Sequence, residues 1–342
     1  MHSASQKPVI IWLLIGCLLV YLMVLLGGIT RLTHSGLSIT EWKVIMGTLP
    51  PLNEDQWQLT FEKYQQSPEF KIVNNHYTLA EFKSIFWWEY LHRLLGRIIG
   101  LVFLIPFIYF LLKKKLDKKV TKNLVVIFLL GGLQGFLGWF MVKSGLVKNP
   151  DVSHYRLAAH LITAFAVFGY IFWVVLNLVY PPEKNISTNT VNSIRKISKW
   201  LFAVVILQII YGAFVAGLNA GLIYNTFPKM GTEWIPESVT ALNPFWKNFI
   251  EGLAGVQFTH RYLAYTIVVL VFTIWYKGTK ITLTERQQQA ITLLVMIVLI
   301  QFLLGMFTLL YSVPLVLGVL HQTGAFVLFS SAIYLLHSIK KN

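Results

Sequence analysis

The sequence predicts an all-α polytopic membrane protein, whose eight transmembrane helices form two pseudo-symmetric parallel four-helix bundles. Three observations predict this class. The chain of 342 residues is 56% hydrophobic and only 13% charged, with a mean hydropathy of +0.62, which leaves too little polar surface for a water-soluble fold. Eight apolar stretches are each long enough to cross a bilayer. The two halves of the chain also resemble each other.

The eight stretches are expected to be helices. A bilayer core is about 30 Å thick and a helix rises about 1.5 Å per residue, so roughly 20 apolar residues cross it once. Backbone polar groups must be paired in lipid, which excludes irregular spans. The first stretch lacks a small-residue cleavage site and is expected to be retained. The expected spans are 9–29, 87–112, 124–142, 157–179, 200–222, 256–275, 290–310 and 314–336.

The net charge of +15 follows the predicted topology. The two termini and the loops after the second, fourth and sixth spans hold sixteen Lys or Arg and three acids. The other loops hold nine Lys or Arg and ten acids. The positive-inside rule therefore places both termini in the cytoplasm. Because topology accounts for nearly all of the charge, it gives no support to a nucleic-acid partner.

A weak internal repeat divides the chain into domains at 1–182 and 183–342. The sequence GGITRLTHSGL at 27–37 aligns with GAFVAGLNAGL at 212–222, and EYLHR at 89–93 aligns with QFTHR at 257–261. Four helices return the chain to the same side of the membrane, so the repeats are parallel. The N-terminal half has a long outer loop, 30–86, which we expect to be ordered and to serve as a lid or docking surface.

Four of the nine histidines lie within the predicted spans, near their outer ends. His92 and His160 belong to the first half, and His260 and His321 hold the corresponding positions in the second. Ionisable residues inside a membrane are usually functional. Two histidines facing each other across each bundle are too few for a closed zinc site but suit the two axial positions of a heme. The alternative is that they are structural or relay protons.

One acid lies within the spans, at a position where the halves differ. Glu89 precedes His92 by three residues, and Gln257 precedes His260 by three. Residues three apart share a helix face, so Glu89 is expected in the pocket of His92, where a carboxylate can exchange protons or stabilise a cation. The halves would then hold a reactive site and a passive redox site. Alternatively, Glu89 forms a buried ion pair with Arg93 or Arg156 that only orients a helix.

Arginines and glycines accompany the histidines. Arg93, Arg156 and Arg261 are candidates to bind heme propionates, although each could equally reach the outer headgroups.

Glycines recur at four-residue spacing, where we expect close helix packing. They are Gly96 and Gly100, Gly131 and Gly135, and Gly217 and Gly221.

Several motifs together resemble heme A synthase, over all eight spans and both long outer loops. They are GGITRLTHSGLSITEWKVIMGTLPPLN at 27–53, FWWEYLHRLLGR at 86–97, VSHYRLAAHL at 152–161, AGLNAGLIYNTFPKMG at 216–231, QFTHR at 257–261 and LGVLHQTGA at 317–325. The outer loop lacks the cysteine pair of some bacterial members, so the chain is most similar to the mitochondrial and bacterial type without it.

The resemblance implies the oxidation of the C8 methyl group of heme O to a formyl group by successive hydroxylations, which gives heme A for cytochrome c oxidase. It assigns the substrate heme to His92 and His160, with Arg93 and Arg156 nearby, and the essential glutamate to Glu89. The cofactor heme b falls to the second half; its iron ligands are His260 and His321, with Arg261 nearby.

The resemblance also implies partners and a location. We expect heme O, an electron donor that the sequence does not identify, contact with heme O synthase, and a lipid bilayer; a homo-oligomer is left open. The expected membrane is the bacterial inner membrane, or the mitochondrial one in a eukaryote, with the heme sites near the outer face. The main alternative is a diheme b-type electron-transfer protein, but its hemes would lie at opposite faces. A transporter would need more polar residues at mid-membrane.

Overall fold

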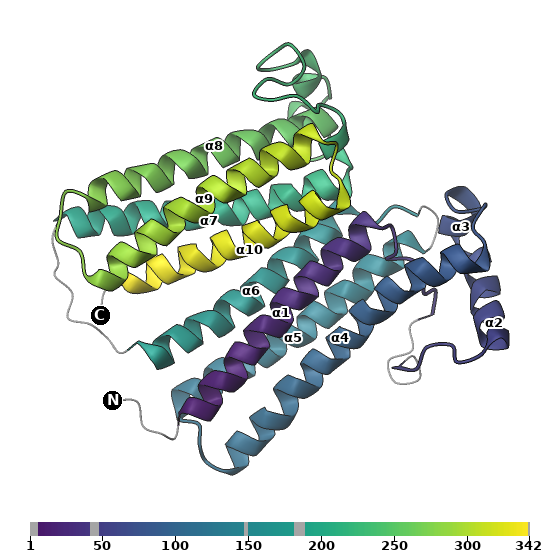
Figure 1. Cartoon of the computed structure of the whole chain (residues 1–342), viewed down its shortest axis with the longest axis horizontal. Coiled ribbons are helices and arrows are strands. Elements are labelled where there is room, and N and C mark those ends of the chain that lie inside the picture. The colour runs from purple at the N-terminus through teal and green to yellow at the C-terminus, as the bar shows by residue number, and fades with distance from the viewer. Residues whose placement is uncertain (1–5, 42–47, 147–149, 181–188, 341–342) are drawn as a thin grey trace. The chain divides into compact units, whose positions relative to one another are not determined.

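The computed structural model describes residues 6–41, 48–146, 150–180 and 189–340, and these residues form helices joined by turns and loops (Figure 1). Eight of the described helices are long and apolar enough to cross a membrane. They confirm the predicted all-α polytopic class. The eight are α1 (Lys7–Leu32), α4 (Leu79–Leu112), α5 (Lys118–Gly145), α6 (His154–Val179), α7 (Asn189–Gly217), α8 (Leu253–Gly278), α9 (Glu285–Leu310) and α10 (Leu315–Ser338).

Several helices extend beyond the predicted spans; α5 begins at Lys118 and α7 at Asn189, for example. Two of the differences at helix ends have clear local reasons. Helix α4 begins at Leu79 rather than at residue 87, because Thr78 and Glu81 form a capping box that starts the helix in a polar segment. Helix α7 ends at Gly217 rather than at residue 222. The chain leaves it through Asn219, whose φ of 54° is left-handed, and a short 3-10 turn follows. Apolarity alone detects neither signal.

The chain forms two compact units, one of Leu14–Phe168 and one of Met1–Leu13 with Gly169–Asn342. The division passes through α1 and α6. The domain boundary predicted between residues 182 and 183 lies outside the described residues, because 181–188 are among those the structure leaves out. That boundary stays a prediction.

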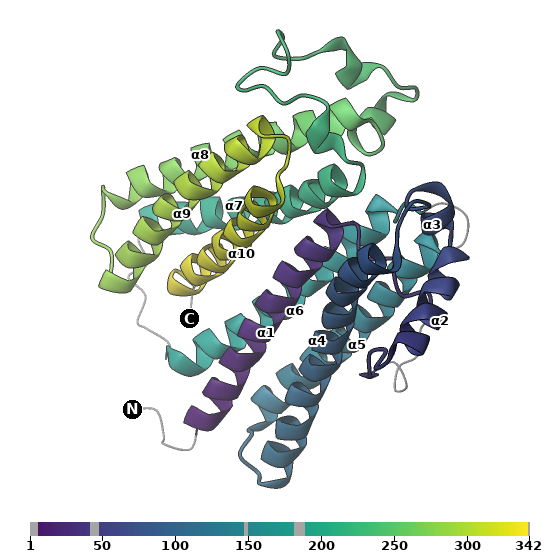
Figure 2. The ribbon, with the colours of Figure 1, turned by 45° about the vertical axis from the view of Figure 1, so that its right-hand side comes forward.

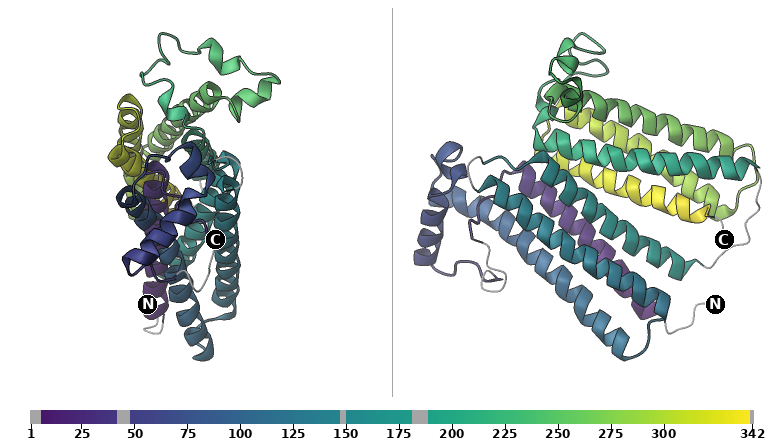
Figure 3. Two further views of the ribbon diagram at one scale, coloured as in Figure 1. Left: turned by 90° about the vertical axis from the view of Figure 1, so that its right-hand side faces the viewer. Right: turned by 180° about the vertical axis from the view of Figure 1, so that it is seen from behind.

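The second unit contains a ring of four helices. Helix α7 packs against α8 and α10, and α9 packs against the same two helices (Figures 1 and 3). In such a ring α8 and α10 lie on a diagonal, so side chains from both can meet in the core. These are the helices that carry the second predicted histidine pair.

In the first unit, glycines bring the helices together in pairs. Gly27 of α1 lies against the His92 ring on α4, and Gly138 of α5 lies against the His160 ring on α6. Helices α4 and α5 also pack against each other. Small residues allow such close approach between transmembrane helices.

The long outer loop contains two further helices, α2 (Glu54–Gln65) and α3 (Pro68–Ile72), which lie beside the first turns of α4 (Figure 2). Their caps are local: Asn53 and Ser67 each accept a backbone N–H of the helix that follows. An apolar cluster attaches α2 to α4. Its buried members are Trp57, Phe61, Tyr64, Phe82, Ile85, Phe86 and Tyr90.

A buried polar group closes the α2–α3 corner. The Tyr64 hydroxyl donates to Oε2 of Glu69 at 3.0 Å and accepts from Nδ2 of Asn74 at 2.8 Å. Burial raises the pKa of the Glu69 carboxyl to about 7; the Tyr64 hydrogen bond opposes this rise, and the charge of Glu89 adds to it. Glu69 therefore changes its charge near neutral pH.

We expect the α2–α3 corner to weaken as the pH rises. A folded-state pKa above the ordinary 4.5 means that the contribution of Glu69 is complete below about pH 4.5 and is lost as the pH rises through about 7. Hydrogen exchange of residues 54–72, corrected for intrinsic rates, should be faster at pH 8 than at pH 5.5. Glu69→Gln should remove this difference, and the exposed control Glu62→Gln should keep it. A difference that survives in Glu69→Gln would assign it to another group.

Candidate functional site

The histidine pair of the second unit has the geometry of two ligands on one metal ion. His260 on α8 and His321 on α10 have ring centres 6.4 Å apart, with planes at 81°. Two imidazoles that each place a nitrogen about 2 Å from one metal ion have ring centres about 6 Å apart. The structure therefore brings the two predicted residues together at a suitable distance.

The two units share the same glycine setting of their histidines. A Cβ atom at Gly27 would lie 3.1 Å from Cε1 of His92, and one at Gly212 would lie 3.4 Å from Cε1 of His260. The partners on the other two helices also match. A Cβ at Gly138 would lie 3.0 Å from Cε1 of His160, and one at Gly305 would lie 2.7 Å from Cε1 of His321.

The donor set fits heme better than a bare metal ion. No group of three or more His, Cys, Asp or Glu within the described ranges could hold a metal ion, whereas a porphyrin needs only two axial ligands from the protein. The Nδ1 atoms of His92, His160 and His260 are buried and have no hydrogen-bond partner in the ranges that the structure describes. Unpartnered imidazole nitrogens of this kind indicate that a ligand completes each site.

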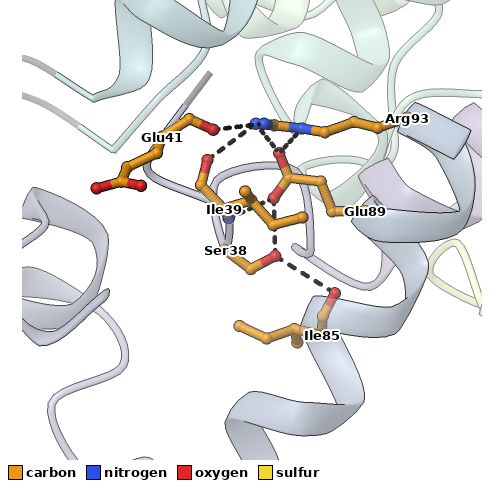
Figure 4. Close-up of polar contacts among 6 residues, drawn as sticks. All are labelled: Ser38, Ile39, Glu41, Ile85, Glu89 and Arg93. Carbon is orange, nitrogen blue, oxygen red and sulfur yellow. Dashed lines mark hydrogen bonds and ion pairs between the residues drawn. The ribbon is translucent and has the colours of Figure 1, made fainter. Parts of the chain in front are cut away.

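Glu89 is buried, with 3% of its surface exposed, and its carboxylate accepts four hydrogen bonds (Figure 4). Oε2 accepts from the Ser38 hydroxyl and from the Ile39 N–H, both at 2.7 Å. Oε1 accepts from Nη2 and Nε of Arg93, at 2.6 and 3.1 Å. The ion pair with Arg93, one of the two alternatives from the sequence, is therefore present.

Arg93 also holds the start of the outer loop. Its guanidinium donates to the carbonyl oxygens of Ile39 at 2.8 Å and Glu41 at 3.0 Å (Figure 4). Together, Glu89 and Arg93 fix residues 38–41 against α4. Buried charge-assisted hydrogen bonds of this kind are strong and directional.

The second unit makes the same attachment without a carboxylate. Arg261 donates to the carbonyl oxygens of Tyr224 at 2.7 Å and Thr226 at 2.9 Å, and Gln257 donates to Tyr224 at 3.2 Å. Tyr224 and Thr226 align with Ile39 and Glu41 of the first half. An amide is thus sufficient to hold this loop, and the charge at Glu89 exceeds what the attachment requires.

Arg156 lies on the first turn of α6 and contacts α5. Its Nη1 donates to the Phe140 carbonyl at 2.8 Å, and its guanidinium lies 3.7 Å from the centre of the Phe140 ring. The structure thus gives Arg93, Arg156 and Arg261 protein partners. Their contact with heme propionates stays a prediction.

Sequence reasoning missed some residues of the site and misjudged others. Ser38 and Ile39 were not singled out, although they fall within the motif at 27–53 and extending the repeat alignment would have shown them. The expected close packing is wrong for Gly100, Gly131 and Gly135, since a Cβ there would meet nothing within 4 Å. The glycines beside the four histidines do face another helix closely.

The close contact between Gly138 and the His160 ring can be tested with Gly135, on the same helix, as the control. Gly138→Ala would push a methyl group against the His160 ring, and overpacking of this kind costs about 1–3 kcal/mol. We expect a lower midpoint of thermal unfolding and weaker binding of hemin in an absorbance titration. Gly135→Ala faces open space and should change neither. Equal effects from the two variants would contradict the assigned contact.

Comparisons with known proteins agree with the motifs. A family profile described as a cytochrome oxidase assembly protein matches residues 10–333. A heme A synthase of Flavobacterium johnsoniae is 53% identical over 98% of this chain and 99% of its own length. Heme A synthases of Nitrosospira multiformis and of a Wolbachia pipientis strain are 48% and 46% identical, over 99% and 98% of this chain and 95% and 94% of their own.

Proposed function

Because the chain belongs to the heme A synthase family of cytochrome oxidase assembly proteins, we propose that its two histidine pairs hold two different hemes, a substrate and a resident cofactor. The chain is a membrane enzyme that converts heme O to heme A, which is an oxidation. The observation that carries the proposal is the repeated setting of the histidine pairs together with the difference between Glu89 and Gln257.

The resident heme belongs to the second unit. His260 and His321 would hold a heme b between their rings. When bound, that group supplies one-electron redox chemistry, with a potential set by its ligands and their hydrogen bonds. The chain's own part is to keep the two imidazoles opposed, which the ring of α7–α10 does, and to close the loop over them through Arg261.

The substrate belongs to the first unit. His92 and His160 would bind heme O and orient it so that its C8 methyl group is oxidised, by successive hydroxylations, to the formyl group of heme A. Residues 38–41 are attached to this bundle by Arg93. Water-poor surroundings would favour the chemistry, because electrostatic interactions are stronger there.

Glu89 is proposed as the catalytic residue that exchanges protons during the oxidation. Its neighbour Ser38 can adapt to either protonation state. The hydroxyl donates to Glu89 as drawn in Figure 4, and it also lies 3.5 Å from the Ile85 carbonyl. When Oε2 takes a proton, Ser38 can turn its O–H to Ile85 and accept from Glu89 instead.

The location follows from charge and family. We infer insertion in the bacterial inner membrane, with cytoplasmic termini and the heme sites near the outer face, because the basic loops mark the inner side. We expect an electron donor to act through the second unit and heme O synthase to be the source of the substrate. The alternative, a diheme electron conduit, has no need for the Glu89 and Gln257 difference.

Heme analysis tests the proposed activity. We expect expression in a host that makes heme O but lacks heme A to give heme A in extracts separated by chromatography. Extracts of the same host with an empty vector should contain heme O alone. Heme O alone in both, with the protein present in the membrane, would contradict the activity.

A further inference from the structure

A glutamine lies one helical turn before three of the four glycines that face the histidines. The pattern is Gln-x-x-x-Gly in α5, α7 and α9, and Met-x-x-x-Gly in α1. The residue pairs are Gln134 and Gly138, Gln208 and Gly212, Gln301 and Gly305, and Met23 and Gly27. Since the glycines occupy equivalent places, the four preceding residues do as well.

Each glutamine amide lies beside one ring nitrogen of its histidine. The amide nitrogen Nε2 of Gln134 lies 3.4 Å from Nε2 of His160, and that of Gln208 lies 3.4 Å from Nε2 of His260. The amide nitrogen of Gln301 lies 3.1 Å from Nδ1 of His321. Gln134 and Gln301 are also fixed by a 3.0 Å hydrogen bond to the carbonyl of the same histidine.

The acceptor side of each amide is unused by the residues that the structure describes. The Oε1 atoms of Gln134, Gln208 and Gln301 are buried and have no hydrogen-bond partner among the described residues. An imidazole that binds metal through one nitrogen carries a proton on the other, and this N–H is almost always given to an acceptor. Turning the glutamine side chain so that Oε1 replaces Nε2 beside the ring presents an acceptor to that proton. In Gln134 and Gln301 this exchanges the hydrogen bond to the histidine carbonyl for one from the imidazole N–H.

The fourth position differs. Met23 replaces the glutamine, and its methyl carbon Cε lies towards Gly96, 3.3 Å from where a Cβ would be. A thioether is at most a weak acceptor. Nδ1 of His92, like Nδ1 of His160 and His260, is buried without a partner within the described part of the chain, but no glutamine precedes the glycine that faces the His92 ring. His92 therefore lacks the amide that the other three histidines have.

We propose that Gln134, Gln208 and Gln301 are positioning residues that strengthen the histidine ligands, and that Met23 leaves His92 as the one weakly held ligand. The inference rests on the proposed function. Both ligands of the resident heme are then reinforced, as a permanent cofactor requires. The substrate heme has one firm ligand in His160 and one labile ligand in His92, so that heme O can enter and heme A can leave.

Reciprocal substitutions test the inference, because Gln and Met have similar length. We measure the transfer of each heme from the purified protein to excess apomyoglobin and the midpoint potential of the heme b. Gln208→Met and Gln301→Met should each speed heme b release about 10–100-fold and raise its potential, since a weaker donor favours the ferrous state. Met23→Gln should slow release of the other heme by a similar factor.

Two controls separate this role from helix packing. Gln208→Glu restores an acceptor oxygen and should return release and potential towards the native values. The exposed Gln288→Met, on the same helix as Gln301, should change neither. Unchanged release and potential in both glutamine variants and in Met23→Gln would overturn the inference while leaving the ligand assignment intact. Native protein without a bis-imidazole heme spectrum would instead contradict the proposed function.

Discussion

Glu89→Gln is expected to lower the yield of heme A by about 10²–10⁴-fold, the range that general acid–base catalysis contributes, while the protein stays folded and keeps its hemes. The reason lies in the second unit, where Gln257 holds its loop with an amide. A glutamine at 89 can still accept from Arg93, so the loop attachment persists. An amide, however, takes up no proton at neutral pH.

The measurement is the ratio of heme A to heme O in extracts of the host that lacks heme A, with the bound heme spectrum recorded on the same protein. Ser38→Ala removes the adaptable hydroxyl but keeps the carboxylate, so its yield should lie between those of the native protein and Glu89→Gln. The exposed Glu62→Gln should match the native protein. A Glu89→Gln protein with native yield would contradict the proton role, and loss of bound heme would show a structural one.

His260→Ala is expected to remove the resident heme. One imidazole is lost from the pair at 6.4 Å, and alanine offers no ligand in its place. Loss of a ligand should exceed the 10–100-fold drop in affinity typical of a lost outer partner, so little heme b should survive purification. The measurement is the bis-imidazole absorption spectrum of the reduced protein.

A histidine outside the pairs provides the control for burial. His337 is also buried, but it contacts Arg286 and Asn177 rather than another of the four histidines. His337→Gln keeps a hydrogen-bonding group and should retain the full spectrum. A full spectrum in His260→Ala would rule out the ligand pairing.

The eight spans could be predicted from composition, and the matching places of the four histidines from the internal repeat. The role of these histidines as heme ligands stays a prediction. The opposition of α8 and α10 also followed, since alternate helices of a bundle meet across its core. The ends of α4 and α7 did not follow, because a capping box and one left-handed residue decide them.

The surroundings of the histidines were harder to predict. Gln134, Gln208 and Gln301 were visible as polar residues in apolar helices, but only their distances to the rings show what they contact. The arginines were candidates to bind propionates, and the structure adds that Arg93 and Arg261 donate to loop carbonyls. Such backbone partners leave no trace in the pattern of side chains.

The account assigns the substrate heme to one histidine pair and the resident heme to the other. This assignment is tested most directly by the types of heme in two purified variants, one per unit. Hemes extracted from His160→Ala and His321→Ala are separated by chromatography and compared with those of the native protein. The account predicts that His160→Ala keeps heme b and loses heme O and heme A, while His321→Ala loses heme b. Loss of heme b from His160→Ala with retention in His321→Ala would contradict it.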